Sequence, residues 1–302
     1  MKCEMHSSED AEKMLLEAAD YSDNFLYEKA VPLLKNLLEY HTDTIEEWSI
    51  SLHLGESYFY LNKYKDCQKY LRRCLKLLPD DEKISTPYLL CYQYLGFSYY
   101  EQSQYGKALS NLDKISDVLS IYEDEERYSD LYLYYLNKGR TLIYLRKFSE
   151  AVLDFEDAYK ANYKEAQITD DYESSYGESL VNLELSRAHT YLHDYTNVAK
   201  YIEKIKIDDL NDCYNECYNY IKTRYYSYSK QYKKAIEMYH RIKHDTEDKI
   251  YSNDLRYFMG YIYYHMNKFT EAGNYFSKVK LGYLWEEQII KEFKLYCLKI
   301  KG

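Results

Sequence analysis

Residues 54–79 read LGESYFYLNKYKDCQKYLRRCLKLLP, and this stretch decides the fold. It contains a small residue, Gly55, then an aromatic nine positions later, Tyr64, and a second small residue three positions further on, Cys67. The same spacing occurs seven times in the 302 residues, and successive second small residues lie 37 to 47 positions apart. Those residues are Ala30, Cys67, Ala108, Ala151, Val198, Ala235 and Ala272. A period of this size is typical of a solenoid built from helix pairs.

Each unit has the features of a helical hairpin. Four positions after the second small residue comes a large apolar or aromatic residue, and steps of three and four return to one face of an α-helix. The first small residues are Ala18, Gly55, Gly96, Gly139, Ser186, Thr223 and Gly260. The aromatics are Tyr27, Tyr64, Tyr105, Phe148, Tyr195, Tyr232 and Phe269.

Small residues on both helices predict that the two backbones approach closely. Four of the nine glycines occupy the first small position, inside a predicted helix. Glycine there costs about 1 kcal/mol relative to alanine, so we expect a close contact to require it. The loops are short, and Asn62 and Asn267 stand where the first helix of a pair must end. The aromatic after each turn is expected to fill the wedge where the pair splays.

The unit around Gly55 resembles the tetratricopeptide repeat. The family's W-LG-Y-Y-A-F-A-P frame is matched, without its Trp and with Cys for both Ala, by Leu54, Gly55, Tyr58, Tyr64, Cys67, Leu71, Cys74 and Pro79. The resemblance covers about residues 11–280 and implies an all-α, right-handed α-solenoid of about seven helical hairpins. The expected repeats form one array over 1–302 and span approximately 11–44, 48–81, 89–122, 132–165, 179–212, 216–249 and 253–283.

Two units depart from this frame. The fifth has His189 where Tyr is common and Val198 where Ala is common. The first carries Pro32 within its second helix, so that helix is expected to start late or to kink.

Residues 284–301 are expected to form one more amphipathic helix. Its apolar residues recur at steps of three and four and are Trp285, Ile289, Phe293, Tyr296 and Ile300. Because the end of a repeat array exposes an apolar face, this helix is predicted to cap the array. Insertion into a partner or self-association is the alternative.

Composition argues against several functional classes. The formal net charge of −10 disfavours binding to nucleic acids or anionic membranes. No apolar run is long enough to span a membrane, and the polar amino terminus lacks the apolar core of a signal peptide. Seven scattered cysteines fit reduced thiols, and the expected location is cytoplasmic. The 42 tyrosines are interpreted mainly as rings that pack in the core and along the groove wall.

The resemblance also implies a ligand-binding groove, because the first helix of each pair lines the concave surface in this family. Positions one and five after the first small residue would then point inward, and in units four to six they are Arg140 and Tyr144, Arg187 and Tyr191, and Arg224 and Tyr228. The same helices carry Asn137, Asn182 and Asn219. Guanidinium groups bind carboxylates or phosphates, so the hypothesis is that these nine residues hold an extended anionic peptide segment. Alternatively, the arginines pair with neighbouring carboxylates such as Glu184 or Glu216.

Catalytic and metal-binding patterns are weak. Three pairs have a spacing of four residues, and they are His189 with His193, His240 with His244, and Cys213 with Cys217. A structural zinc site needs four ligands within reach, so no metal or cofactor is expected. The P-loop, the dinucleotide fingerprint and the zinc-protease motif are all absent, and the chain is not expected to be an enzyme.

The favoured function is therefore a non-enzymatic scaffold or adaptor that holds an extended, acidic segment of a protein or peptide partner. A regulator switched by a short signalling peptide is the alternative, although no helix-turn-helix precedes the repeats. A secretion chaperone is a third possibility.

Overall fold

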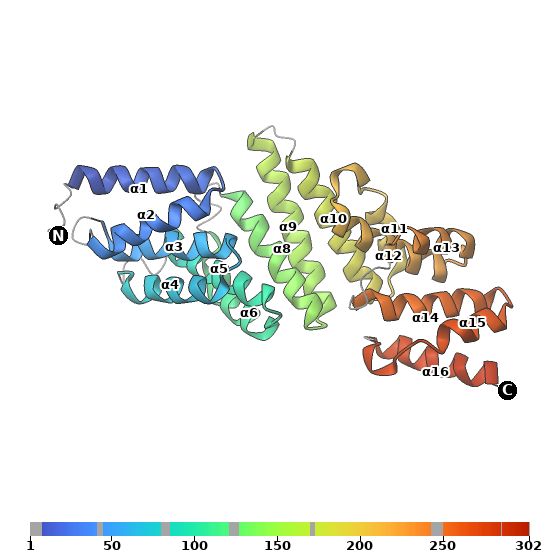
Figure 1. Ribbon diagram of the computed structural model, residues 1–302. Coiled ribbons are helices and arrows are strands. Elements are labelled where there is room, and N and C mark those ends of the chain that lie inside the picture. The colour runs from blue at the N-terminus through green and yellow to red at the C-terminus, as the bar shows by residue number, and fades with distance from the viewer. Residues whose placement is uncertain are drawn as a thin grey trace. The chain divides into compact units, whose positions relative to one another are not determined.

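The computed structural model describes residues 8–40, 45–79, 85–120, 127–169, 173–242, 250–284 and 286–301. In these ranges the chain consists of α-helices, short 3₁₀ helices and turns, without a β-strand (Figure 1). The expected all-α class is confirmed. The chain forms two compact units, Met1–Lys147 and Phe148–Gly302. The single array over 1–302 stays a prediction.

The first unit is a stack of antiparallel helix pairs. The pairs are α1 (Ser8–Asp23) with α2 (Tyr27–Tyr40), α3 (Glu47–Tyr60) with α4 (Tyr64–Leu77), and α5 (Thr86–Glu101) with α6 (Tyr105–Leu112). A 3₁₀ helix, η2 (Asp113–Val118), and α8 (Tyr128–Tyr144) follow. Each pair packs on the next, because α2 contacts α3, α4 contacts α5, and the first helices α3 and α5 contact each other.

The second unit repeats this arrangement. It begins with α9 (Phe148–Thr169), which packs on α10. The pairs are α10 (Glu173–Tyr191) with α11 (Tyr195–Ile202), α12 (Asp212–Tyr228) with α13 (Tyr232–His240), and α14 (Ile250–His265) with α15 (Phe269–Phe276). The short helices η3 (Ile207–Asp209) and η4 (Leu281–Tyr283) lie between elements, and α16 (Glu287–Lys301) packs on α14 and α15.

The predicted small residues are the packing points of the hairpins. All seven second small residues are completely buried. A Cβ atom added to Gly96 would lie 2.7 Å from Leu112 Cγ, and one added to Gly55 or Gly260 would overlap Leu71 or Phe276. In each of these pairs the glycine faces the residue four positions after the second small residue. The expectation that these glycines permit close helix contact is confirmed.

Each hairpin turn contains one residue in the left-handed backbone region, always two positions before the aromatic. These residues are Phe25, Asn62, Ser103, Arg146, His193, Lys230 and Asn267, with φ between 56° and 61°. At Asn62 the turn closes when the Lys63 amide donates to the Tyr58 carbonyl over 2.9 Å. This bond satisfies a carbonyl at the helix end. Asn was predicted at two of these turns, and the structure shows the same geometry at five others without the usual Gly or Asn.

Two details concern the chain ends. The second helix of the first unit begins at Tyr27 and includes Pro32, so the expected late start is wrong. Because Pro32 lies in the second turn of α2, it removes one backbone hydrogen bond near the start of that helix.

At the carboxyl end of the second unit, α16 buries Ile289 and Phe293 in a cluster with Phe276. Trp285 lies outside the described residues. Within those residues, no helix is both long and apolar enough to cross a bilayer.

Candidate functional site

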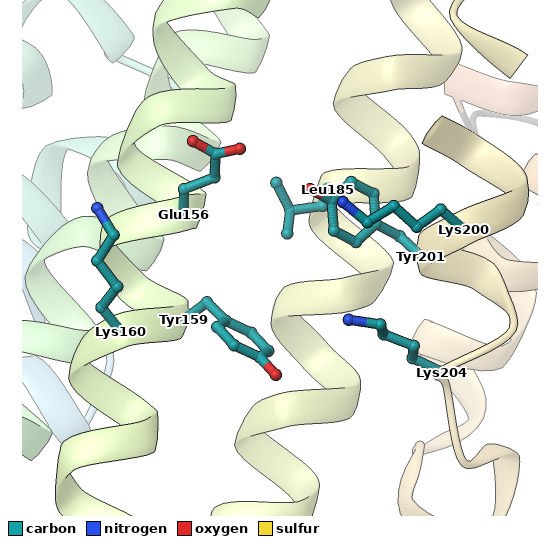
Figure 2. A pocket seen from close by; sticks show the side chains of 7 residues that line it. All are labelled: Glu156, Tyr159, Lys160, Leu185, Lys200, Tyr201 and Lys204. Carbon is teal, nitrogen blue, oxygen red and sulfur yellow. The ribbon is translucent and has the colours of Figure 1, made fainter. Parts of the chain in front are cut away.

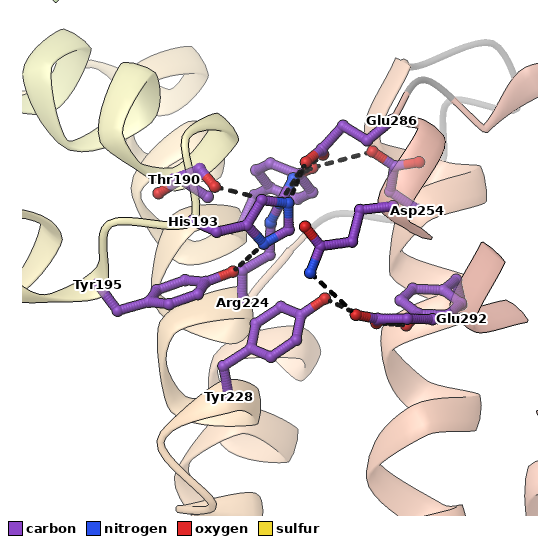
Figure 3. A network of polar contacts seen from close by, with 11 residues as sticks. Thr190, His193, Tyr195, Arg224, Tyr228, Asp254, Glu286 and Glu292 are labelled. Carbon is purple, nitrogen blue, oxygen red and sulfur yellow. Dashed lines mark hydrogen bonds and ion pairs between the residues drawn. The ribbon is translucent and has the colours of Figure 1, made fainter. Parts of the chain in front are cut away.

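The centre of the second unit is a buried guanidinium group, Arg224 of α12, which is 0% exposed. Its Nη1 and Nη2 donate to the two carboxylate oxygens of Glu286 over 2.5 and 3.0 Å. Nη1 also donates to the Tyr220 hydroxyl over 3.0 Å, and Nη2 to the Thr190 carbonyl over 3.3 Å (Figure 3). Arg224 Cζ lies 5.0 Å from the ring centroid of Phe258 and 5.4 Å from that of Tyr191. This geometry is bidentate carboxylate binding inside an aromatic frame.

Two carboxylates of this network, Glu286 and Glu292, come from the start of α16 and the residue before it (Figure 3). Besides Arg224, Glu286 contacts His193 Nε2 at 3.1 Å. One turn and a half later, Glu292 accepts hydrogen bonds from Tyr228 at 3.2 Å and Tyr257 at 2.5 Å. Burial raises the pKa of Glu286, but Arg224 and His193 outweigh it and hold that pKa below its usual value. Glu286 is therefore ionised at neutral pH.

Asp254 of α14 is a second buried carboxyl group beside Arg224. It accepts a hydrogen bond from the Tyr220 hydroxyl at 3.0 Å. Burial raises the pKa of Asp254 to about 7, although Arg224 lowers it, and the negative charge of Glu286 adds to the increase. One guanidinium thus faces two carboxyl groups. Glu286 is ionised at neutral pH, whereas Asp254 gains or loses its proton near that pH.

Arg187 of α10 is also held inside the unit. It is 7% exposed, and its Nη1 lies 3.1 Å from Glu184 Oε2, which is the pairing considered as the alternative from the sequence. Asn182, one turn earlier, is completely buried and donates to the Glu178 carbonyl over 2.9 Å. Asn219 of α12 is half-buried, and its carbonyl accepts from Thr223.

The predicted groove tyrosines stack against the repeat aromatics. In each case the aromatic that begins the second helix of one pair packs on position five of the next first helix. Ring centroids lie 4.4 to 6.1 Å apart in the pairs Tyr27–Tyr60, Tyr105–Tyr144, Phe148–Tyr191, Tyr195–Tyr228 and Tyr232–His265. The repeat aromatic was expected to fill the wedge within a pair, and it also joins successive pairs. Such ring pairs contribute about 0.5–1.5 kcal/mol each beyond their buried area.

In the first unit, α8 carries the remaining predicted residues. Arg140 is half-buried, and its charge lowers the pKa of Glu101, which burial raises. Asn137 donates to the Leu133 carbonyl over 2.8 Å, and Tyr144 stacks on Tyr105. Of the three predicted arginines, Arg140 is the most accessible to solvent.

A pocket of about 260 Å³ opens between α9, α10 and α11 of the second unit (Figure 2). The residues that line it are Glu156, Tyr159, Lys160, Leu185, Lys200, Tyr201 and Lys204. No motif in the sequence pointed to it, since its residues come from three helices with no shared spacing.

Comparison with known proteins gives likeness in fold. RapI, in a crystal structure of its apo form, matches 96% of this chain and 99% of its own at 12% identity, with a TM-score of 0.55. Pseudomonas aeruginosa PilF matches 82% of this chain and 98% of its own at 14% identity, with a TM-score of 0.56. A tetratricopeptide repeat protein from Parabacteroides merdae covers 96% and 99% at 15% identity, with a TM-score of 0.47.

Stacked hairpins with buried small residues, a left-handed turn and a following aromatic reproduce the frame quoted from the sequence. The chain has the tetratricopeptide repeat fold. No family model matches its sequence, and no curated protein does. The tetratricopeptide hairpins account for the small residues and aromatics, and the polar network involves residues outside that frame.

Sequence reasoning missed Glu286 and Glu292, the carboxylates that face the tetratricopeptide helices. They lie 62 and 64 residues after the groups they bind, Arg224 and Tyr228, so no local pattern connects them.

The two histidines considered as a metal-ligand pair each face a carboxylate. His189 lies 3.3 Å from Asp194, and His193 contacts Glu286. His244 lies outside the described residues. Within those residues, no three His, Cys, Asp or Glu side chains are grouped as metal ligands would be.

Proposed function

We propose that this protein is a non-enzymatic scaffold that binds a protein or peptide partner, and that the partner presents an extended acidic segment to the first helices of the repeats. The fold supports the general role, because stacked hairpins offer a long surface of helix faces for a partner. The six cysteines of the described chain are not joined in disulfides, which suits the reducing cytoplasm that we propose as its location.

The observation that carries the acidic partner is the Arg224 network. There the first helices of two repeats bind two carboxylates through one guanidinium and two tyrosine hydroxyls. The carboxylates come from the chain itself, so a partner could reach Arg224 only if Glu286 withdrew. Arg140 repeats the Arg-x-x-x-Tyr pattern in the first unit and is partly exposed. It is therefore the position where an external carboxylate has the easiest access.

The test is the binding of a labelled hexaglutamate peptide, followed by fluorescence anisotropy at low and high salt. Arg140→Gln should weaken binding severalfold, because it removes the guanidinium without burying a charge. Arg146→Gln is the matched control, since it removes the same charge from an exposed residue of the same hairpin. Equal affinities for the two variants, or no binding of hexaglutamate to the unaltered protein, would reject the acidic partner.

A further inference from the structure

The pocket between α9, α10 and α11 has aromatic walls and an apolar lining residue (Figure 2). Tyr159 and Tyr201 contribute their rings from α9 and α11, and the buried Leu185 comes from α10. Its volume of about 260 Å³ exceeds the roughly 150 Å³ that accommodates benzene and is below the roughly 300 Å³ where drug-sized sites begin. The space suits one aromatic ring with a single substituent.

The walls are held in place by contacts outside the pocket. The Tyr159 hydroxyl donates to Glu178 over 3.2 Å. The Tyr201 ring stacks on His189, with centroids 5.5 Å apart and an interplanar angle of 19°. His189 is buried and faces Asp194 at 3.3 Å. Fixed rings reduce the ordering cost when a flat ligand enters.

Three ammonium groups surround the pocket, although the chain as a whole carries a net charge of −10. Lys160 pairs with Asp157 at 2.7 Å. Lys200 and Lys204 form no ion pair with a carboxylate of the described chain. Lys204 Nζ lies 5.7 Å from the Tyr159 centroid and 5.9 Å from that of Tyr201, and Lys200 Nζ lies 4.9 Å from the Tyr201 centroid. Within the described residues these two lysines thus form no ion pair, and the carboxylate that lines the pocket beside them is Glu156.

We propose that this pocket binds an aryl phosphate, a single aromatic ring that carries a phosphate group. The ring packs between Tyr159 and Tyr201 against Leu185, and the phosphate binds Lys200 and Lys204. Lysine serves phosphate as a point charge without a fixed hydrogen-bonding plane, which suits two ammonium groups on flexible stems. The site is separate from the proposed acidic groove, because Leu185 and Arg187 lie about 160° apart around α10 and so on opposite faces of that helix.

The first experiment titrates the full chain with phenyl phosphate and follows amide chemical shifts by NMR. We expect saturable shifts at α9–α11 with a Kd of about 1 mM or tighter. The double variant Lys200→Glu/Lys204→Glu should weaken binding severalfold at low salt, because it replaces two exposed positive charges at the pocket by negative charges that repel the phosphate. Lys233→Glu/Lys234→Glu is the matched control, since it makes the same charge change on exposed lysines of α13. Equal weakening in both double variants, or no saturable shift, would overturn the proposal.

A second experiment separates the ring from the phosphate. Tyr201→Leu keeps an apolar wall but removes the aromatic face, so phenyl phosphate should bind more weakly while inorganic phosphate is unaffected. If inorganic phosphate binds the unaltered protein as tightly as phenyl phosphate does, the aryl part of the proposal is wrong. A short phosphotyrosine peptide distinguishes the two sources of the group. Tighter binding than phenyl phosphate indicates a peptide, and equal binding indicates a free aryl phosphate. Failure of hexaglutamate to bind would leave these results unchanged.

Discussion

Replacing Glu286 by Gln tests whether the Arg224 network holds the second unit together. The substitution preserves shape but removes the negative charge that faces a guanidinium with 0% exposure. Taking one partner from a buried ion pair costs about 3–5 kcal/mol, because the remaining charge is left uncompensated. Asp254 limits this loss. Its pKa of about 7 falls when the Glu286 charge is gone, so Asp254 then ionises beside Arg224 at neutral pH. We expect a loss of about 2–4 kcal/mol at pH 7.

The matched control is Glu237→Gln. Arg241 and Glu237 form an ion pair at 2.6 Å, close to the 2.5 Å of Arg224 and Glu286, but their side chains are 56% and 58% exposed. Exposed helix pairs of this kind contribute about 0.3–0.5 kcal/mol. The two substitutions therefore change the same chemical groups at nearly the same distance, and differ in burial.

The assay is urea unfolding of the full chain, followed by far-UV circular dichroism and by tyrosine fluorescence. Because repeat arrays can unfold in parts, the two signals should be fitted separately. A double-mutant cycle with Arg224→Met isolates the pair, and the coupling energy should exceed about 1.5 kcal/mol. Equal losses for Glu286→Gln and Glu237→Gln, or additive effects in the cycle, would refute the reasoning.

Two further predictions concern packing and pH. Gly96→Ala should destabilise the first unit by up to about 2 kcal/mol in thermal unfolding, because overpacking against Leu112 exceeds the gain in helix propensity. The control is Gly106→Ala, which should be neutral or stabilising because no atom lies within 4 Å of the new Cβ. Asp254 has a folded-state pKa of about 7, above its unfolded value, so its protonated form contributes stability below about pH 4 that is lost as the pH rises through 7. Asp254→Asn should keep that stability, and its urea midpoint should exceed that of the unaltered protein by an amount that grows from pH 5 to about 7 and then levels off. Parallel pH curves for the two proteins over this range would contradict the prediction.

Much of the fold followed from local spacing. A small residue, an aromatic nine positions later and a second small residue three positions after it predicted the hairpins, and the second small residues are all buried. The left-handed turn residue was anticipated only at Asn62 and Asn267. At Phe25 or Lys230 the side chain gives no such signal, and the surrounding hairpin imposes the conformation.

The candidate site was less accessible to sequence reasoning. The spacing singled out Arg224 but did not predict its burial, because Glu286 and Thr190, which bind it, lie on other elements. Tyr144, Tyr191 and Tyr228 were expected on a groove wall, and each packs on an aromatic from the preceding pair. Whether these residues also contact a partner stays a prediction.

The amino-acid sequence by itself determined the helix pairs, because their small residues, turns and aromatics act within about forty positions and obey the period of the helix. Only the tertiary structure decided which charges are satisfied internally. Glu286 meets Arg224, which lies 62 residues earlier in the chain, whereas Lys200 and Lys204 form no ion pair within the described residues. Electrostatic pairing depends on distance in space and on exclusion of water, and neither quantity is set by spacing along the chain.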